Sequence, residues 1–501
     1  MHWLEYHEAT KHTLERLYAR PHTLDWANMP DPFRHYEGVP IADLPAGSPV
    51  PVAPALDVLR GVRGEFETTS GADWLSSLLF HSAAISATKR VPSTGHRYAL
   101  RVNPSSGNLH PTEFHFVARG IAGWEDGLYH YRPSEHTAEQ RMRGDASFLL
   151  SPALRGYPLV FVLTSIAWRE AWKYRERAYR YCCHDIGHAW GALALAARAL
   201  GCEAFAHGHF AEEKLRDEMR LTDEWPMLIV AIEGPSIPRA DSPKAQAWFG
   251  GTPNPLSSEI VPYPSIDAIH QATSCDGTTA MAQPAPRHPN PGSIELRPLA
   301  ESETSFATAA RRRRSALDFQ GGWTNLRFEQ LSTQLDATAR PFQADFEGDL
   351  YGTLPARYVE LYLYVHRVDE LDRGVYRYDA PTSTLECIAT GDQRLMAAGL
   401  SLGQDLAGNS CVTYSMIADL ERAARDHGER AYRYVFFEAG MIGQRLYLAA
   451  EAMGFQSTGI GAFYDDNVHR YLNIEPEQGQ VVYHFASGYA IHDPRIEDEE
   501  A

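Results

Sequence analysis

Two segments of this chain repeat one another in residue type and in spacing. The run 180–201, which begins Arg-Tyr and ends Leu-Gly, matches the run 433–454 at a constant shift of 253 residues (433 − 180). Upstream, the run 127–131 matches the run 374–378 at a shift of 247 residues (374 − 127). Two matches in the same order indicate a duplicated domain. A duplicated domain in one chain is a covalently joined twofold dimer, whose sites can lie between the halves.

The composition is that of a chain with two ordinary hydrophobic cores. Of the 501 residues, 44% are hydrophobic and 22% are charged, which is enough for two domains. The formal net charge of −18 disfavours nucleic acid or an anionic membrane as the main partner, because both require a basic face. No segment is long and apolar enough to span a membrane, and the first residues lack a secretion-signal pattern, so we expect a cytoplasmic protein.

The cysteines and histidines predict neither a disulfide framework nor a metal site. The six cysteines are irregularly spaced and form no Cys-x-x-Cys pair, so we expect buried thiols. His184 and His188 are four residues apart in a segment that we expect to be helical, a spacing that zinc ligands can use. Because no third ligand is evident, we predict no metal.

The order of expected elements indicates two α+β domains. Each half shows an alternating strand, at 113–118 and at 360–365, and later a buried strand, a long Ala-rich helix and a closing strand. Consecutive strands with helices interspersed are typical of α+β domains, and no Gly-x-Gly-x-x-Gly follows a strand. We divide the chain into a first domain, a Pro/Ser/Thr/Ala-rich linker, a second domain and a loose acidic tail, at residues 1–252, 253–298, 299–496 and 497–501.

The sharpest local motif is the loop 104–113, Pro-Ser-Ser-Gly-Asn-Leu-His-Pro-Thr-Glu. It begins at Pro104 and offers the hydroxyls of Ser105 and Ser106, the amide of Asn108 and several backbone amides, just ahead of a strand. Such a loop can bind the polar edge of a planar ligand. Taken alone, the same residues are more typical of an ordinary turn.

Two segments of the second half carry complementary chemistry. The run 311–319 holds four consecutive arginines next to Ser315, which form either a compact anion site or a solvated helix face. The run 457–466 contains Gly459 and Gly461 on either side of Ile460. Glycines at this spacing let a ligand ring lie against the backbone.

Together, and in this order, the three motifs resemble those of the FMN-dependent nitroreductase superfamily. The first half is most similar to the SagB-type branch, which oxidises azoline rings in modified peptides; that similarity rests on Tyr6-His7, Leu24-Asp25-Trp26 and the run 169–188. The resemblance implies an FMN cofactor and two tandem nitroreductase-like domains that form an intramolecular pseudo-dimer. It implies a flavin site made by Pro104, Ser105, Ser106 and Asn108 of one half with Arg312, Arg313, Ser315, Gly459, Ile460 and Gly461 of the other.

Each half has lost part of this set of residues. At the shift of 247 residues the flavin loop falls on 351–360, where glycine and proline replace Ser105 and Asn108. At the shift of 253 residues the arginine and glycine segments of the second half fall on 60–66 and 206–208. These first-half segments keep only some of the arginines and glycines. Since one complete set remains, we predict a single FMN per chain.

One position departs from the family pattern near the expected phosphate. Leu317 stands where the family often has a basic residue. The resemblance then implies that Arg313 binds the phosphate, helped by Arg312 or by Arg495 beyond the last strand.

Lys173 and Tyr174 match a Lys-Tyr pair that the SagB-type branch uses in proton transfer. A lysine desolvated beside a flavin can take a proton from a substrate carbon while hydride moves to FMN. The second half has Asp426 and His427 at these places, so we expect only one reactive pair. The alternative is a surface stretch laced with ion pairs.

Asp185 and Glu438 occupy matching places near the start of the two long helices. We expect these carboxylates to cap the helices or to bind arginines such as Arg177 and Arg430.

The favoured function is therefore an oxidoreductase that passes hydride between FMN and a small organic or peptidic substrate. Azoline rings, nitroaromatics or quinones, and unsaturated metabolites remain open as substrates, with NAD(P)H as one candidate electron donor. The alternatives are a non-catalytic FMN-binding or storage protein and a scaffold that has lost the flavin. We expect a monomer with an internal pseudo-dimer or a weak homodimer.

Overall fold

A computed structural model describes residues 1–19, 22–240, 245–278, 284, 286–297, 299–341, 343–347 and 357–498. The first half contributes strands β1 Tyr36–Glu37, β2 Ile41–Asp43, β3 Ile85–Arg90, β4 Arg97–Arg101, β5 Thr112–Ala118, β6 Gly127–Arg132, β7 Thr137–Arg143, β8 Leu159–Ser165, β9 Glu203–His207, β10 Trp225–Glu233, β11 Ala247–Trp248 and β12 Thr252–Pro253. The second half contributes β13 Ile294–Glu295, β14 Val359–Val365, β15 Gly374–Asp379, β16 Thr384–Thr390, β17 Val412–Ala418, β18 Gln456–Ile460, β19 Gln480–Gly488 and β20 Ile496–Asp498.

Helices surround these strands in both halves. They are α1 Trp3–Ala9, α2 Leu14–Ala19, α3 Ala55–Arg60, α4 Gly71–Phe80, α5 Ala167–Tyr174, α6 Ala178–Ala199, α7 Glu212–Glu218, α8 Pro264–Ala272, α9 Phe306–Arg312, α10 Phe328–Ala339, α11 Arg394–Leu400, α12 Asp405–Asn409, α13 Leu420–His427, α14 Ala431–Ala452 and α15 Asp465–Leu472. Two short 3-10 turns matter for the site, η5 Arg175–Arg177 and η6 Gly428–Arg430.

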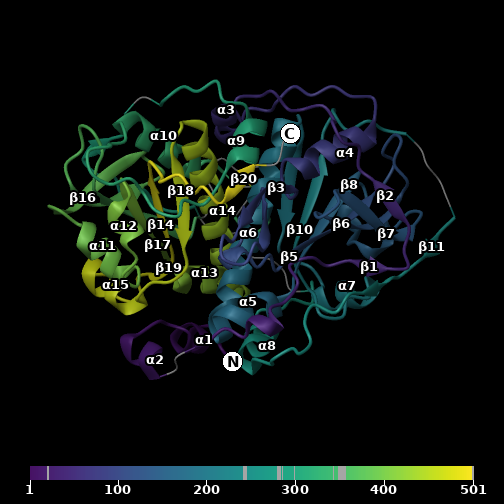
Figure 1. Cartoon of the computed structure of the whole chain (residues 1–501), viewed down its shortest axis with the longest axis horizontal. Coiled ribbons are helices and arrows are strands. Elements are labelled where there is room, and N and C mark those ends of the chain that lie inside the picture. Colours follow the sequence, from purple (N-terminus) through teal and green to yellow (C-terminus); the bar gives the residue numbers. More distant parts are fainter. Residues whose placement is uncertain are drawn as a thin grey trace.

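The two halves have the same antiparallel sheet. The order β7-β6-β5-β8-β10-β9 in the first half corresponds to β16-β15-β14-β17-β19-β18 in the second, and the sheets lie on either side of α6 and α14 (Figure 1). The central strands β5 and β8 consist entirely of buried residues. Strands on both sides of the duplication match the predicted segments, so the prediction of two tandem α+β domains is confirmed.

The long helices α6 and α14 meet at a pair of glycines. A Cβ on Gly187 would lie 2.2 Å from the Phe437 carbonyl oxygen, and a Cβ on Gly440 would lie 2.2 Å from the His184 carbonyl oxygen. The two helix backbones can therefore touch only because both positions lack a side chain. This contact explains why glycine occurs at the same place in both repeats.

Two buried ion clusters join the halves. Arg177 and Arg180 donate to Asp465 of the second half, at 3.2 and 3.0 Å. Correspondingly, Arg430 and Arg433 donate to Glu212 of the first half. The two carboxylates are themselves related by the shift of 253 residues (465 − 212), so the clusters obey the pseudo-twofold symmetry.

Asp185 and Glu438 do not cap the helices or bind Arg177 and Arg430, although Glu438 does lie 4.0 Å from another arginine, Arg357. The arginines at 177 and 430 bind Asp465 and Glu212 instead. Asp185 and Glu438 lie inside α6 and α14, beyond the first turn, and accept hydrogen bonds from the segments that lead into β5 and β14. Partners that lie 80 residues away in sequence are set by tertiary packing, which the motif did not reveal.

The segment predicted as a linker contains the first helix of the second repeat. In α8, Ile266 and Ile269 are buried in the main core. Arg433 donates to the Thr273 hydroxyl and the His270 carbonyl, just as Arg180 donates to the Thr10 hydroxyl and the His7 carbonyl at the end of α1. The repeated His-x-x-Thr spacing, at a shift of 263 residues (270 − 7), was the sequence signal for this helix.

The predicted loose tail is also partly ordered. Glu497 and Asp498 belong to β20, which pairs with β3 of the first half, and Asp498 accepts from Arg314 at 2.6 Å. The open edge of β3 supplies the backbone partners, which composition cannot show. Residues 499–501 lie outside the described part. The N-terminal arm makes the converse contact with the second half, because Trp3 and Tyr6 of α1 pack against the Tyr432 ring.

Most cysteines are buried, as expected, but Cys275 is half-buried and Cys387 is exposed. Neither 22-residue helix, nor any other helix in the described ranges, has the length and apolar character that a bilayer span requires.

Candidate functional site

A cavity of about 810 Å³ lies between the halves and receives residues from both. We call it the interface cavity. Its lining includes every residue predicted for the flavin and the reactive pair but one: Pro104, Ser105, Ser106, Asn108, Lys173, Tyr174, Arg313, Ser315, Gly459, Ile460, Gly461 and Arg495. The exception is Arg312, which is exposed and does not line the cavity.

Helix α6 holds the first-half loop, at residues 104–113, through one carboxylate. Asp185 accepts hydrogen bonds from the Ser105 hydroxyl at 2.6 Å and from the Ser106 hydroxyl at 2.9 Å, together with the Ser106 amide. Asn108 donates to the Ala99 carbonyl. Burial raises the pKa of Asp185 to about 7, although these hydrogen bonds oppose the shift. The serine hydroxyls thus fix the loop to its own half, a role that the motif did not predict.

Arg313 reaches across the interface from the end of α9. Its guanidinium donates to the carbonyls of Val102 and Arg101, at 2.9 and 3.0 Å. Burial lowers the pKa of Arg313 to about 10. Its Nη1 is buried and has no hydrogen-bond partner among the described residues. One N–H group of this arginine is therefore available to an acceptor in the cavity.

More cations gather where β3, β20 and the end of α9 meet. Arg495 and Lys89 both bind Asp493, at 2.7 and 3.0 Å. Arg314, which sequence reasoning missed, donates to Ser86 and to Asp498. Four basic residues of this region line the interface cavity: Lys89, Arg313, Arg314 and Arg495. This end of the cavity can bind an anion.

The two glycines of β18 and its following loop make room for tyrosine rings. A Cβ on Gly461 would lie 2.2 Å from the Tyr181 ring, and a Cβ on Gly459 would lie 2.2 Å from the Tyr483 hydroxyl. The Tyr181 hydroxyl donates to the Gly461 carbonyl at 2.9 Å. Tyr447 bonds to both Ser315 and the Gly459 amide. Sequence analysis found the glycines but not the tyrosines, because aromatic residues are abundant in the core.

Lys173 and Tyr174 end helix α5 beside the first-half loop. A Cβ on Gly107 would lie 2.7 Å from the Tyr174 hydroxyl and 2.9 Å from the Lys173 Nζ. Burial, reinforced by Glu170, raises the pKa of Tyr174 well above its usual value, so the phenol keeps its proton at neutral pH. Within the described ranges, no carboxylate lies at ion-pair distance from Lys173. The alternative of a surface stretch laced with ion pairs does not fit this lysine.

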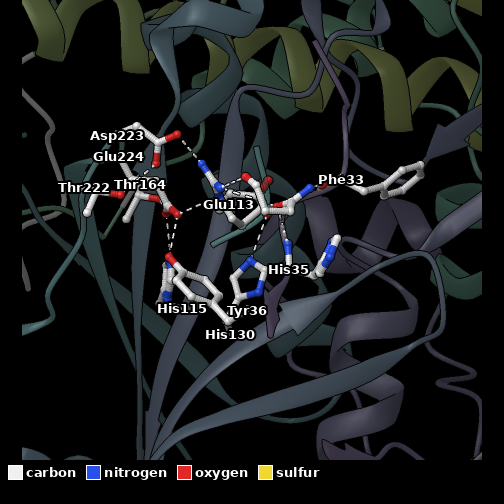
Figure 2. Close-up of polar contacts among 12 residues, drawn as sticks. Phe33, His35, Tyr36, Glu113, His115, His130, Thr164, Thr222, Asp223 and Glu224 are labelled. Atoms are coloured by element: carbon white, nitrogen blue, oxygen red, sulfur yellow. Dashed lines mark hydrogen bonds and ion pairs between the residues drawn. The ribbon is translucent and has the colours of Figure 1, made fainter. Parts of the chain in front are cut away.

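Glu113 and His130 belong to a buried polar network in the first-half sheet (Figure 2), and Arg169 of α5 also binds Glu113. Glu113 accepts from Arg169 of α5 and lies 3.1 Å from His130, and both side chains are almost fully buried. Burial alone would raise the pKa of Glu113, but Arg169 and His130 lower it to about 2. Arg169 also donates to the His110 carbonyl at 2.7 Å. The network therefore fixes the loop and the helix that carries Lys173 relative to each other.

The pseudo-twofold symmetry relates the flavin site to a second position in the interface. There, residues 345 and 346 of the chain occupy the space. Asp345 accepts from the amides of Gly208 and His209, at 2.8 and 3.3 Å. Phe346 is fully buried and stacks on Tyr434, with ring centroids 4.3 Å apart and planes 8° apart. Gly208 and Tyr434 are the counterparts of Gly461 and Tyr181. The predicted loss of the second-half loop concerns residues 351–360, of which 351–356 lie outside the described part.

Comparisons with known proteins agree with this geometry. The family model "Nitroreductase family" matches residues 82–234 and 358–489, more than half of the chain. A solved structure of a candidate nitroreductase from Anabaena variabilis is 27% identical and superimposes with a TM-score of 0.78 over 98% of this chain and 99% of its own. The chain therefore belongs to the nitroreductase family, in a form with two such domains in tandem.

Curated relatives match parts of the chain. A candidate nitroreductase of Methanocaldococcus jannaschii is 30% identical over 117 residues, which are 23% of this chain and 59% of the relative. The trifolitoxin-processing protein TfxB of Rhizobium leguminosarum bv. trifolii is 32% identical over 142 residues, which are 26% of this chain and 38% of the relative. The chain thus covers less than two thirds of the length of either relative.

Proposed function

We propose that this chain is an FMN-dependent oxidoreductase of the SagB-type dehydrogenase kind, with one FMN bound between its halves. It would transfer hydride between that FMN and a small organic or peptidic substrate, in the cytoplasm, with NAD(P)H as a candidate donor. The observation that carries the proposal is the complementary construction of the interface cavity. The loop and the Lys-Tyr pair come from the first half, whereas the arginines and glycines come from the second.

The residues present fit an FMN. The buried and unpartnered Nη1 of Arg313, in a cluster with Lys89, Arg314 and Arg495, suits a phosphate group. The cavity of about 810 Å³ falls within the roughly 300–1,000 Å³ of typical ligand sites. Bound there, the flavin would supply the two-electron redox chemistry.

The residues of the chain would position the substrate and manage its protons. Lys173 Nζ, which lies beside the Gly107 loop, would accept a proton from the substrate carbon. Tyr174, whose phenol stays protonated because its pKa is raised, would donate a hydrogen bond to the substrate. Arg169 would keep both groups in register with the loop.

A peptidic substrate is supported by one relative. The match to a trifolitoxin-processing protein, at 32% identity over 142 residues, favours the peptide-modifying branch over nitroaromatics.

The visible spectrum and cofactor content of the purified protein test the proposal. We expect a yellow protein whose denatured supernatant contains one FMN per chain by absorbance and mass spectrometry. Two flavins per chain would contradict the single site. An FMN that neither NAD(P)H nor a substrate can reduce under anaerobic conditions would instead support the storage alternative.

A further inference from the structure

A second cavity adjoins the interface cavity at the reactive pair. It measures about 770 Å³ and lies between the N-terminal arm, at residues 8–19 and 22, and the end of α5 with η5. We call it the arm chamber. Lys173, Tyr174 and Tyr181 line both cavities. A molecule in the arm chamber would therefore contact the same pair as a ligand of the interface cavity.

The duplication supplies a counterpart to this chamber. A cavity of about 890 Å³ lies between the end of α8 and η6, with Asp426, His427 and Tyr434 in its wall. We call it the sibling chamber. At the shift of 253 residues, Asp426 stands for Lys173 and Gly428 stands for Arg175. A comparison of the two chambers therefore shows which side chains occur only in the arm chamber.

The arm chamber is lined by both basic and acidic side chains. Glu8 and Asp466 both bind Lys11, at 2.6 and 2.9 Å. Arg16 donates to two backbone carbonyls, and no carboxylate lies at ion-pair distance from Lys173 within the described ranges. Among the acids, Glu176 is 3.7 Å from Arg175. The lining thus combines five basic side chains with four acidic ones, and Arg175 is the basic residue that directly follows the reactive pair.

Arg175 holds an unusual backbone conformation next to that pair. Its φ and ψ are 52° and −133°, a region that only glycine adopts without a steric penalty. Gly428 has nearly the same values, 62° and −148°. The turn between the two helical segments requires this geometry in both halves. In the first half an arginine occupies it despite the penalty, which indicates that the guanidinium has a use.

We propose that the arm chamber is the substrate site and that Arg175 binds a carboxylate of an organic substrate whose reacting carbon lies beside Lys173 and Tyr174. The guanidinium forms a planar fork that matches a carboxylate, and Arg16 of the N-terminal arm also lines the chamber. This inference rests on the proposed function, since it assigns the substrate class to the same reactive pair.

Binding of a matched pair of probes tests this assignment. We would titrate 4-nitrobenzoate and 4-nitrobenzamide, which differ in charge at one group, into the purified holoprotein by calorimetry. We expect the carboxylate to bind at least about tenfold more tightly, as one charge-assisted hydrogen bond allows. Arg175→Gly should abolish the preference and should still fold, because Gly428 holds the same turn in the sibling half. Arg175→Lys, which keeps the charge, should retain part of it.

A control variant removes the same charge from the sibling chamber. Lys214 lines that chamber, and Lys214→Ala should leave the preference for the carboxylate unchanged. Equal binding of the two probes to the unmodified protein, or an unchanged preference in Arg175→Gly, would overturn the assignment. Because the titration does not depend on turnover, a protein that binds the carboxylate but never exchanges hydride would contradict the proposed function alone.

Discussion

At the scale of single residues, Asp185 decides how the first-half loop is held. Its carboxyl accepts hydrogen bonds from both Ser105 and Ser106. The carboxyl is buried, and no cation among the described residues lies at ion-pair distance from it. The loop therefore depends on a carboxyl whose ionised form is disfavoured by burial.

This arrangement predicts a pH-dependent stability. The folded-state pKa of Asp185 is about 7, whereas an unfolded aspartate titrates near pH ~4. The stabilisation from the bound proton is complete below the unfolded value and is lost as pH rises towards 7. Between pH 5 and pH 8, urea unfolding should therefore show the native protein losing on the order of 2 kcal/mol relative to Asp185→Asn. A constant difference between the two proteins over that range would refute the assignment.

Two neighbouring arginines provide a matched test of the anion site. Arg313 is buried with one N–H group unpartnered, whereas Arg312 is exposed outside the cavity. Arg313→Ala should weaken FMN binding by at least about tenfold, because a charge-assisted hydrogen bond is lost. Arg312→Ala should change the dissociation constant by less than about threefold, as expected of a screened surface charge. Both constants follow from quenching of flavin fluorescence, and equal effects would mean that the phosphate lies elsewhere.

At the scale of elements, the turn that joins α5 to η5 stores strain that the sibling turn avoids. Arg175→Gly should raise the free energy of unfolding by about 1 kcal/mol, since a Cβ in this backbone region costs roughly 1–3 kcal/mol. Gly428→Ala should lower it by a similar amount, and nothing lies within 4 Å of the added Cβ to complicate the result. Thermal or urea unfolding of both variants measures the effect. Stabilisation by Gly428→Ala would show that the strain is not real.

The elements also show which parts of the fold could be read from sequence. The central strands and both long helices were predicted because their hydrophobic patterns are long and regular. Strand β20 was missed, because a charged three-residue strand forms only where β3 offers an open edge. Helix α8 was missed as well, although Pro264 at its start and buried isoleucines at 266 and 269 are helix signals. In the site, motif residues were found, whereas Asp185, Tyr181 and Arg314 act through contacts between distant segments.

At the scale of the whole molecule, the pseudo-twofold symmetry is kept where the halves are joined and broken where the chemistry occurs. The ion clusters around Asp465 and Glu212 are equivalent, but at the counterpart of the flavin site Phe346 packs against Gly208 and Tyr434. The same interface thus holds one open site and one that the chain fills itself.

Removing the carboxylate charge from each ion cluster in turn distinguishes an effect on folding stability from an effect on FMN binding. Asp465→Asn and Glu212→Gln each leave two buried arginines without a counter-charge, which should cost about 3–5 kcal/mol of unfolding free energy in either case. Only Asp465 neighbours the open site, because Arg177 and Tyr181 both contact the Gly461 carbonyl. Asp465→Asn should therefore weaken FMN binding as well, whereas Glu212→Gln should leave the dissociation constant within about threefold of the native value, as remote sites behave independently. Urea unfolding and flavin titration of both variants check this, and equal losses of FMN affinity would show that the two sides of the interface are not separable.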